Sequence, residues 1–194
     1  MFTGFLATKV GMSQIIDNET GKITPVTYIS VEENIVTQIK TIEKDGYNAV
    51  VLGTNKYNKP TKTRIFKNVK EFKVDSVEGI KIGDKVNLSD FEGMGECHVT
   101  GVSKGKGFAG PVKRWNRTIA RKTHGTKYIR HGSTMNSCIT GRSKKGIKMA
   151  GHMGNENTTL KFREVSLIDL DENVFAIKGP IPGFNGGSLI IKKA

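Results

Sequence analysis

Acidic residues are missing from a long internal stretch of this chain of 194 residues. The 59 residues from 97 to 155 contain no Asp or Glu, yet they contain 13 Lys and Arg. The other 18 Lys and Arg equal the 18 Asp and Glu, so the formal net charge of +13 falls within this one block. Such a block repels itself and needs an external polyanion, of which the phosphate backbone of nucleic acid is the commonest.

Cysteines and long apolar runs are also scarce. Cys97 and Cys138 are the only two thiols, too few for a disulfide framework. No apolar run approaches the roughly 20 residues of a membrane span, and the first 12 residues are too short and polar for a signal peptide. We therefore expect a protein of a reducing, soluble compartment that makes no membrane contact.

Large apolar residues are sparse inside the acid-free block, where glycine is frequent instead. Burial within the block alone cannot offset the entropy of ordering it. The flanking regions are denser in apolar residues, and the length suits one domain, or one domain with an appendage.

The flanking regions show a β pattern. Short runs rich in Val, Ile, Thr and Tyr alternate with Gly, Pro, Asn and Asp turns, which predicts strands at residues 24–31, 35–43, 47–54, 85–88, 160–170, 174–178 and 188–192. The first two are expected to form a hairpin, and the basic residues 56–70 are expected to form a loop or a short helix. Many short strands favour an antiparallel barrel or sandwich, which the basic block interrupts as an insertion tethered at both ends.

Three motifs within the block allow other interpretations. Gly105, Gly107 and Gly110 match GxGxxG, but Pro111 follows, and no acid stands about 20 residues on to hold a ribose. A backbone that approaches phosphates closely, with Lys104 and Lys106 supplying charge, explains the glycines better.

The four histidines and both cysteines fall at residues 97–152, but no Cys-x-x-Cys or His-x-x-x-His pair suggests a metal. The block also offers no carboxylate to orient a catalytic histidine. We therefore expect no metal, no cofactor, no small-molecule substrate and no catalytic residue. Trp115, the only tryptophan, is either a packing anchor for the base of the block or a stacking surface for an RNA base.

Several segments resemble the bacterial or organellar form of the large-subunit ribosomal protein L-three family. Within the block these are TGVSKGKGF at 100–108, KRWN at 113–116, THG at 123–125, GS at 132–133 and KMAGHMGN at 148–155. Outside it they are KVGMSQ at 9–14, KDGYNA at 44–49, KGPIPG at 178–183 and NGG at 185–187. The resemblance covers essentially the whole chain in the same order.

The resemblance implies a mostly β fold. Its body, residues 1–100 and 156–194, would be a six-stranded β-barrel like those of translation factors, with a small α+β part. Residues 101–155 would form a long, extended, Gly-rich basic arm inserted between strands. The arm would penetrate rRNA toward the peptidyl transferase centre, while the body binds rRNA near its 3′ end early in subunit assembly.

The expected RNA-binding residues are the cations of the arm and polar or aromatic residues beside them: Lys104, Lys106, Lys113, Arg114, Trp115, Arg117, Arg121, Lys122, His124, Lys127, Arg130, His131, Arg142, Lys144, Lys145, Lys148, His152 and Asn155. The expected arm tip near the peptidyl transferase centre contains Ser133, Asn136 and Ser137, and Asn136 stands where many bacterial members carry a methylated Gln.

The sequence thus predicts a structural component of the large ribosomal subunit rather than an enzyme. Its expected partners are large-subunit rRNA and, from the family, the neighbouring proteins L-fourteen and L-nineteen. Its expected location is the ribosome of the cytoplasm, with an organellar matrix as the alternative. The other functions left open are a DNA- or RNA-binding module outside the ribosome and a nucleotide-dependent enzyme.

Overall fold

A computed structural model of the chain describes residues 2–17, 21–125, 127–130 and 145–194. The chain divides into two compact units. We call Met1–Ser103 with Asn157–Ala194 the barrel unit, and Lys104–Glu156 the basic unit.

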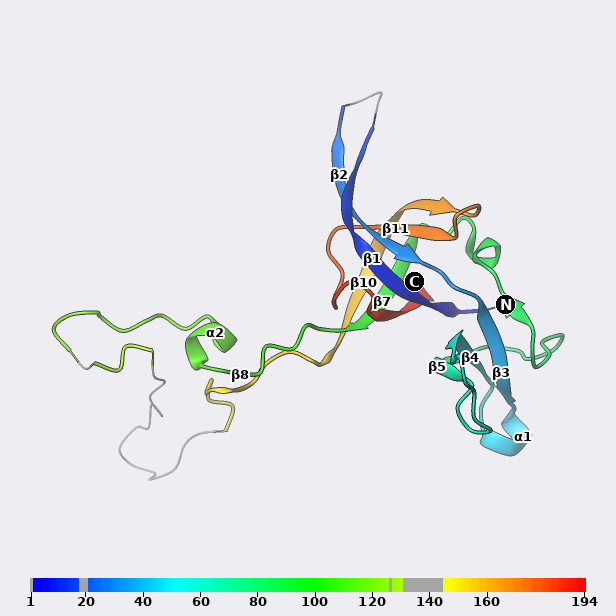
Figure 1. Ribbon diagram of the computed structural model, residues 1–194, viewed down its shortest axis with the longest axis horizontal. Helices are drawn as coiled ribbons and strands as arrows, with labels where there is room; N and C mark the ends of the chain where they lie inside the picture. Colours follow the sequence, from blue (N-terminus) through cyan, green and yellow to red (C-terminus); the bar gives the residue numbers. More distant parts are fainter. Residues whose placement is uncertain (1, 18–20, 126, 131–144) are drawn as a thin grey trace. The chain divides into compact units, whose positions relative to one another are not determined.

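Six antiparallel strands of the barrel unit form a closed barrel in the order β1, β12, β7, β10, β11 and β2 (Figure 1). The ring closes because β1 pairs with β12 on one edge and with β2 on the other. The bounds are β1 Gly4–Ile16, β2 Ile23–Ser30, β7 Glu96–Val102, β10 Asn157–Asp169, β11 Val174–Lys178 and β12 Ser188–Lys193. The prediction of a mostly β protein is confirmed, and six is the strand number that the family resemblance implies.

A second sheet of four strands belongs to the same unit, in the order β5, β4, β3 and β6. Its strands and the two short helices near them are β3 Asn34–Lys40, α1 Ile42–Asp45, β4 Ala49–Lys56, β5 Phe66–Lys73, β6 Lys85–Val86 and the 3₁₀ helix η1 Leu88–Phe91. Helix α1 ends at Gly46, whose φ of 82° is the left-handed conformation that glycine adopts without a Cβ penalty.

One hydrophobic core joins the barrel to the four-stranded sheet. Phe5 of β1 packs against Phe91 and Phe175, with ring centroids 4.7 and 5.7 Å apart. Leu52 and Phe72 of the second sheet are fully buried in the same cluster. The two sheets are therefore expected to fold as one body, since each buries its apolar face against the other.

The predicted hairpin between residues 24–31 and 35–43 is wrong, although strands β2 and β3 cover most of both segments and only the end of the second belongs to α1. β2 pairs with β1 and β11, whereas β3 pairs with β4 and β6. The buried Asn34 turns the chain from one sheet to the other. Its amide accepts from the Leu6 N–H at 2.9 Å and donates to the Leu6 carbonyl at 3.0 Å. The side chain thus makes the two hydrogen bonds that a neighbouring strand would otherwise make to Leu6.

The segment 56–70, predicted as a loop or short helix, is a loop at residues 57–65, whereas residues 66–70 belong to strand β5. β4 ends at Lys56, the loop covers residues 57–65, and β5 begins at Phe66. Its exposed lysines obscured the period of a strand because β5 lies at the edge of the sheet, where charged residues are common.

The basic unit contains only β8 Phe108–Ala109, α2 Pro111–Trp115 and β9 Gly151–His152 as regular elements among its described residues. Of these residues only Ala109 and Pro111 are buried. The chain leaves the barrel after Val102 and returns at Asn157, and these two residues are paired across β7 and β10. Among the helices of the described residues, none has the length and hydrophobicity needed to cross a membrane.

Candidate nucleic-acid interface

The two motif segments at the ends of the basic unit pair with each other as a short antiparallel ribbon. Phe108 lies opposite His152 and Ala109 opposite Gly151. The Lys106 N–H donates to the Met153 carbonyl at 2.9 Å, and the Met153 N–H donates to the Gly107 carbonyl at 3.0 Å. The ribbon holds Lys104 and Lys106 with their side chains exposed.

Gly154 allows the two strands of this ribbon to approach closely. Its φ is +76°, and a Cβ at this position would collide with the Lys104 carbonyl oxygen. Only glycine combines that backbone conformation with that space. The glycines of the KMAGHMGN motif therefore have a structural reason at the base of the unit.

Helix α2 is fastened to the returning segment through Trp115 and Arg114. The Trp115 indole N–H donates to the Met149 carbonyl at 2.9 Å, and Arg114 donates to the same oxygen at 3.2 Å. The Arg114 guanidinium lies over the Trp115 ring, 5.0 Å from a ring centroid, and over Gly151, where a Cβ would be 2.6 Å from its Nη1. These contacts orient the indole while leaving 41% of Trp115 exposed. Trp115 can therefore anchor the base of the basic unit and still offer a ring face on which an RNA base stacks.

A hollow of about 730 Å³ opens beside Trp115. It is lined by Trp115, Asn116, Arg117, Thr118, Gly146, Ile147 and Lys148. The lining contains one aromatic side chain and two cationic ones, and it contains no acid. That combination suits a nucleotide, whose base stacks on aromatic rings and whose phosphate attracts cations.

The charge of the basic unit is almost entirely of one sign. Glu156 is its single acid against 13 Lys and Arg. The described cations are exposed, except Arg114 and Arg117, which are half-buried. An exposed cationic surface of this density attracts a polyanion over a distance set by the salt concentration.

The structure brings only part of the predicted site together. Lys104, Lys106, His152 and Asn155 lie on or beside the ribbon, and Lys113, Arg114 and Trp115 lie on α2. Exposed segments beyond α2 contain the other described members, Arg117, Arg121, Lys122, His124, Lys127, Arg130, Lys145 and Lys148. The remaining predicted residues lie outside the described part of the chain: His131, Ser133, Asn136, Ser137, Arg142 and Lys144. RNA contact by any of these residues stays a prediction.

Two aromatic residues of the basic unit were not among the predicted site residues. Phe108 is 81% exposed and Tyr128 is 69% exposed. Large exposed aromatic rings beside lysines are typical of surfaces that stack on bases. Their position inside the acid-free block was the sequence signal that could have placed them with Trp115.

The GxGxxG segment lacks the geometry of a dinucleotide site. The Lys106 N–H within it bonds to Met153 rather than pointing into an open cradle. The following helix α2 has only five residues, whereas a dinucleotide-binding fold places a full crossover helix there.

The described histidines and cysteine belong to no metal-binding cluster. No group of three His, Cys, Asp or Glu residues in the described part of the chain could hold a metal ion. The His98 Nδ1 accepts from the Phe162 N–H at 3.1 Å, and its ring packs edge-on against Phe162. Burial raises the pKa of the Cys97 thiol to about 11, so this thiol is protonated at neutral pH.

Comparison with known proteins shows similarity over nearly the whole chain. A sequence profile described as "Ribosomal protein L3" matches residues 31–179. Proteins named "Large ribosomal subunit protein uL3" are similar throughout. The one from Alkaliphilus metalliredigens is 41% identical over 97% of this chain and 96% of its own length. Those from Pasteurella multocida and Dehalococcoides mccartyi are 40% and 38% identical, over 98% and 100% of this chain and 98% of their own lengths.

Proposed function

We propose, from the premise that this chain belongs to the ribosomal protein L3 family, that it binds large-subunit rRNA as a structural component of the large ribosomal subunit. It binds near the 3′ end of that rRNA early in assembly, and its basic unit reaches into folded rRNA toward the peptidyl transferase centre. It works in the ribosome of the cytoplasm, beside other large-subunit proteins, with L-fourteen and L-nineteen among its neighbours.

A single observation supports this proposal most: the exposed cations of the basic unit face no comparable number of acids. The unit has 13 Lys and Arg against Glu156 alone, and almost none of its described residues is buried. Folded rRNA crowds phosphates together, and cations that enter the crowded region replace condensed counterions. Burial of the unit's surface in RNA also supplies the contacts that the unit does not make within itself.

The mechanism is neutralisation together with shape. Lys104 and Lys106 project from the ribbon, while Trp115 and the adjacent hollow offer a surface for one unstacked base. Contacts to phosphates position a protein on RNA and carry little sequence information. The family therefore implies a scaffold for the RNA, with peptide transfer left to the RNA itself. The role of Ser133, Asn136 and Ser137 at the tip belongs to the same proposal.

Salt dependence of binding to full-length large-subunit rRNA tests the function. If about half of the 13 cations contact phosphates, the slope of log affinity against log salt is roughly −5 for the whole protein. A variant with Lys104→Gln, Lys106→Gln and Lys113→Gln should flatten that slope by about 2. A matched variant with Lys44→Gln, Lys81→Gln and Lys161→Gln, three exposed lysines of the barrel unit, should leave it nearly unchanged.

A slope near zero for the unmodified protein contradicts the proposal. Co-sedimentation with large subunits after a high-salt wash separates it from a nucleic-acid-binding module outside the ribosome. A ribosomal component remains with the subunit, whereas a protein held by general electrostatic attraction is removed by the wash.

A further inference from the structure

We propose that the hairpin of β4 and β5 is a second RNA-binding surface, located in the barrel unit and separate from the predicted arm residues. We call residues 56–73 the hairpin surface. The inference rests on the proposed function, because it assigns a second contact to the same rRNA. Its ligand is the phosphate backbone of an RNA strand, with one base resting in a groove beside the hairpin.

The first observation is a second acid-free stretch. Residues 46–70 contain no Asp or Glu and six cations, Lys56, Lys59, Lys62, Arg64, Lys67 and Lys70. The barrel unit as a whole has 18 Lys and Arg against 17 Asp and Glu. The net charge of the barrel unit is therefore close to zero because the positive charge of the hairpin is offset by a negative charge on the rest of the unit.

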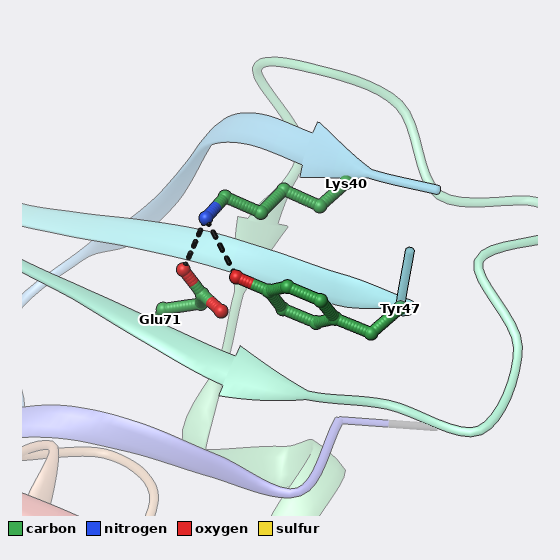
Figure 2. A network of polar contacts seen from close by, with 3 residues as sticks. All are labelled: Lys40, Tyr47 and Glu71. Atoms are coloured by element: carbon green, nitrogen blue, oxygen red, sulfur yellow. Dashed lines mark hydrogen bonds and ion pairs between the residues drawn. The ribbon is translucent and has the colours of Figure 1, made fainter. Parts of the chain in front are cut away.

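The second observation concerns the one acid of β5, Glu71, which already has a partner. Lys40 of β3, in the same sheet, donates to the Glu71 carboxylate at 2.6 Å and to the Tyr47 hydroxyl at 2.9 Å (Figure 2). Glu71 is thus neutralised by Lys40 rather than by the hairpin. Within the described residues, no ion pair joins an acid to Lys59, Lys62, Arg64, Lys67 or Lys70, and all five are exposed.

The third observation is a groove of about 480 Å³ on the hairpin, with a mixed apolar and polar lining. Its apolar lining residues are Val51, Tyr57, Ile65, Phe66 and Val69, and its polar ones are Thr37, Gln38, Thr63, Arg64 and Lys67. The Phe66 ring lies on the backbone of β4, since a Cβ on Gly53 would be 2.7 Å from its Cγ. Lys56 lies 6.0 Å from the centre of the same ring.

This arrangement fits RNA by its chemistry. Bases stack on exposed rings such as Tyr57, which is 40% exposed, and phosphates pair with arginine and lysine. Arg64 and Lys67 are three residues apart across the start of β5, so they can contact neighbouring phosphates while the ring contacts the base. An acidic protein would match the charge, but it does not pair each negative charge with a planar ring, whereas every phosphate of an RNA strand is followed by a base.

The experiment uses the full chain and full-length large-subunit rRNA. A hairpin variant with Lys62→Gln, Arg64→Gln and Lys67→Gln is compared with the Lys44→Gln, Lys81→Gln, Lys161→Gln control, which removes the same charge elsewhere in the barrel unit. We expect the hairpin variant to lose about 100-fold in affinity at 0.1 M salt and to flatten the salt slope by about 2, since each phosphate contact contributes about 0.7 to 0.9. Lys62→Arg with Lys67→Arg should retain the affinity of the unmodified protein.

The outcomes separate this inference from the function it rests on. Unchanged affinity and slope in the hairpin variant, with loss only in the Lys104, Lys106, Lys113 variant, overturn the hairpin site and leave rRNA binding intact. An unmodified protein that shows no salt-dependent binding overturns the proposed function instead. If the hairpin variant binds rRNA normally but no longer associates with an acidic large-subunit protein, the surface is a protein-docking site and the RNA assignment is wrong. Equal thermal unfolding of the hairpin and control variants excludes misfolding as the cause of any loss.

Discussion

At the scale of single residues, the buried Asn34 makes three hydrogen bonds to the backbone of the barrel unit. Its amide satisfies both backbone groups of Leu6 and also donates to the Glu32 carbonyl at 2.9 Å. The side chain is fully buried. Buried backbone groups need partners, and here one side chain supplies them where the chain passes from the barrel to the second sheet.

Substitution Asn34→Ala is therefore expected to lower the free energy of unfolding by about 2 to 4 kcal/mol, because it leaves the Leu6 N–H and carbonyl buried without partners. Denaturant unfolding of the full chain measures the change. Asn58→Ala, an exposed position in the hairpin loop, serves as the control and should change stability by less than about 0.5 kcal/mol. A loss below about 1 kcal/mol at Asn34 would mean that water or a rearranged backbone replaces the amide.

The ion pair of Lys40 and Glu71 predicts a pH dependence. The hydrogen bond from Lys40, and secondly that with Tyr47, holds the pKa of Glu71 below its ordinary 4.5. The hydrogen bond to Glu71 raises the pKa of Lys40 above its ordinary 10.5. The lowered pKa of Glu71 means that its ionised carboxylate stabilises the fold above about pH 4.5, and this stabilisation is lost as the pH falls through the pKa of the folded state. The raised pKa of Lys40 means that its charged amine stabilises the fold below about pH 10.5, and this stabilisation is lost as the pH rises through the pKa of the folded state.

The unfolding temperature of Glu71→Gln should accordingly lie below that of the unmodified protein at neutral pH. The gap should narrow as the pH falls below 4.5, because the carboxyl that the variant lacks becomes protonated in the unmodified protein. The control is Glu92→Gln, which alters an exposed acid and whose unfolding temperature is measured over the same pH range. A Glu71→Gln gap that stays constant down to about pH 2 would show that packing, not charge, causes the difference.

At the scale of elements, the ribbon of the basic unit depends on glycine. Substitution Gly154→Ala forces a Cβ against the Lys104 carbonyl at a φ of +76°. Left-handed backbone alone costs about 1 to 2 kcal/mol for a residue with a Cβ. Hydrogen exchange at the Lys106 and Met153 amides should accelerate by about tenfold or more.

Gly110→Ala is the matched control for this test, since a Cβ there meets nothing within 4 Å. Equal exchange rates in both variants would mean that the ribbon is already open in the free protein. In that case its order comes from RNA rather than from its own hydrogen bonds.

Some elements were predictable from sequence because their signals are local. Residues 174–178 form β11 as predicted, since a run of β-formers follows the turn residues at 171–173. The pairing of β2 was not predictable in this way. Its partner β1 begins in a segment with Gly4, Lys9 and Gly11, whose mixture of glycine and charge hid a strand of 13 residues. Strand partners are chosen by contacts distant in sequence, and no local pattern records them.

The same distinction between local signals and contacts distant in sequence applies to the candidate site. Cations such as Lys104 and Lys148 were predictable because charge is a property of the residue type, independent of geometry. The Trp115 bond to the Met149 carbonyl and the hollow beside it depend on segments more than 30 residues apart. The basic character of residues 56–70 was visible in the sequence, but the groove beside them also needs Thr37 and Gln38 of β3, which no pattern within that segment records.

At the scale of the whole molecule, the basic unit is expected to be dispensable for folding. The hydrophobic core cluster lies entirely within the barrel unit. Val102 and Asn157 are paired, so the two ends of the inserted segment are already neighbours. Replacing residues 103–156 by Asn-Gly should give a chain that unfolds cooperatively within about 5 °C of the full protein, because a two-residue Asn-Gly turn suits the antiparallel pair of Val102 and Asn157.

The shortened chain should also show a much flatter salt slope with rRNA, since 13 cations are removed. Its remaining affinity should depend on Lys62, Arg64 and Lys67 if the hairpin surface binds RNA. Circular dichroism and filter binding measure the two properties separately. A shortened chain that fails to unfold cooperatively would show that the basic unit contributes to the core after all.

The position of β12 has a consequence for the order of events during synthesis. β12 lies between β1 and β7, so the barrel is missing one strand until β12 emerges from the translating ribosome. The basic unit precedes β12 in the chain and is therefore synthesised while the barrel is still open. A nascent chain at that stage exposes apolar faces and a cationic segment together, which is the condition under which an aggregation-prone intermediate is best protected by a chaperone. The barrel can therefore close only after β12 has been synthesised.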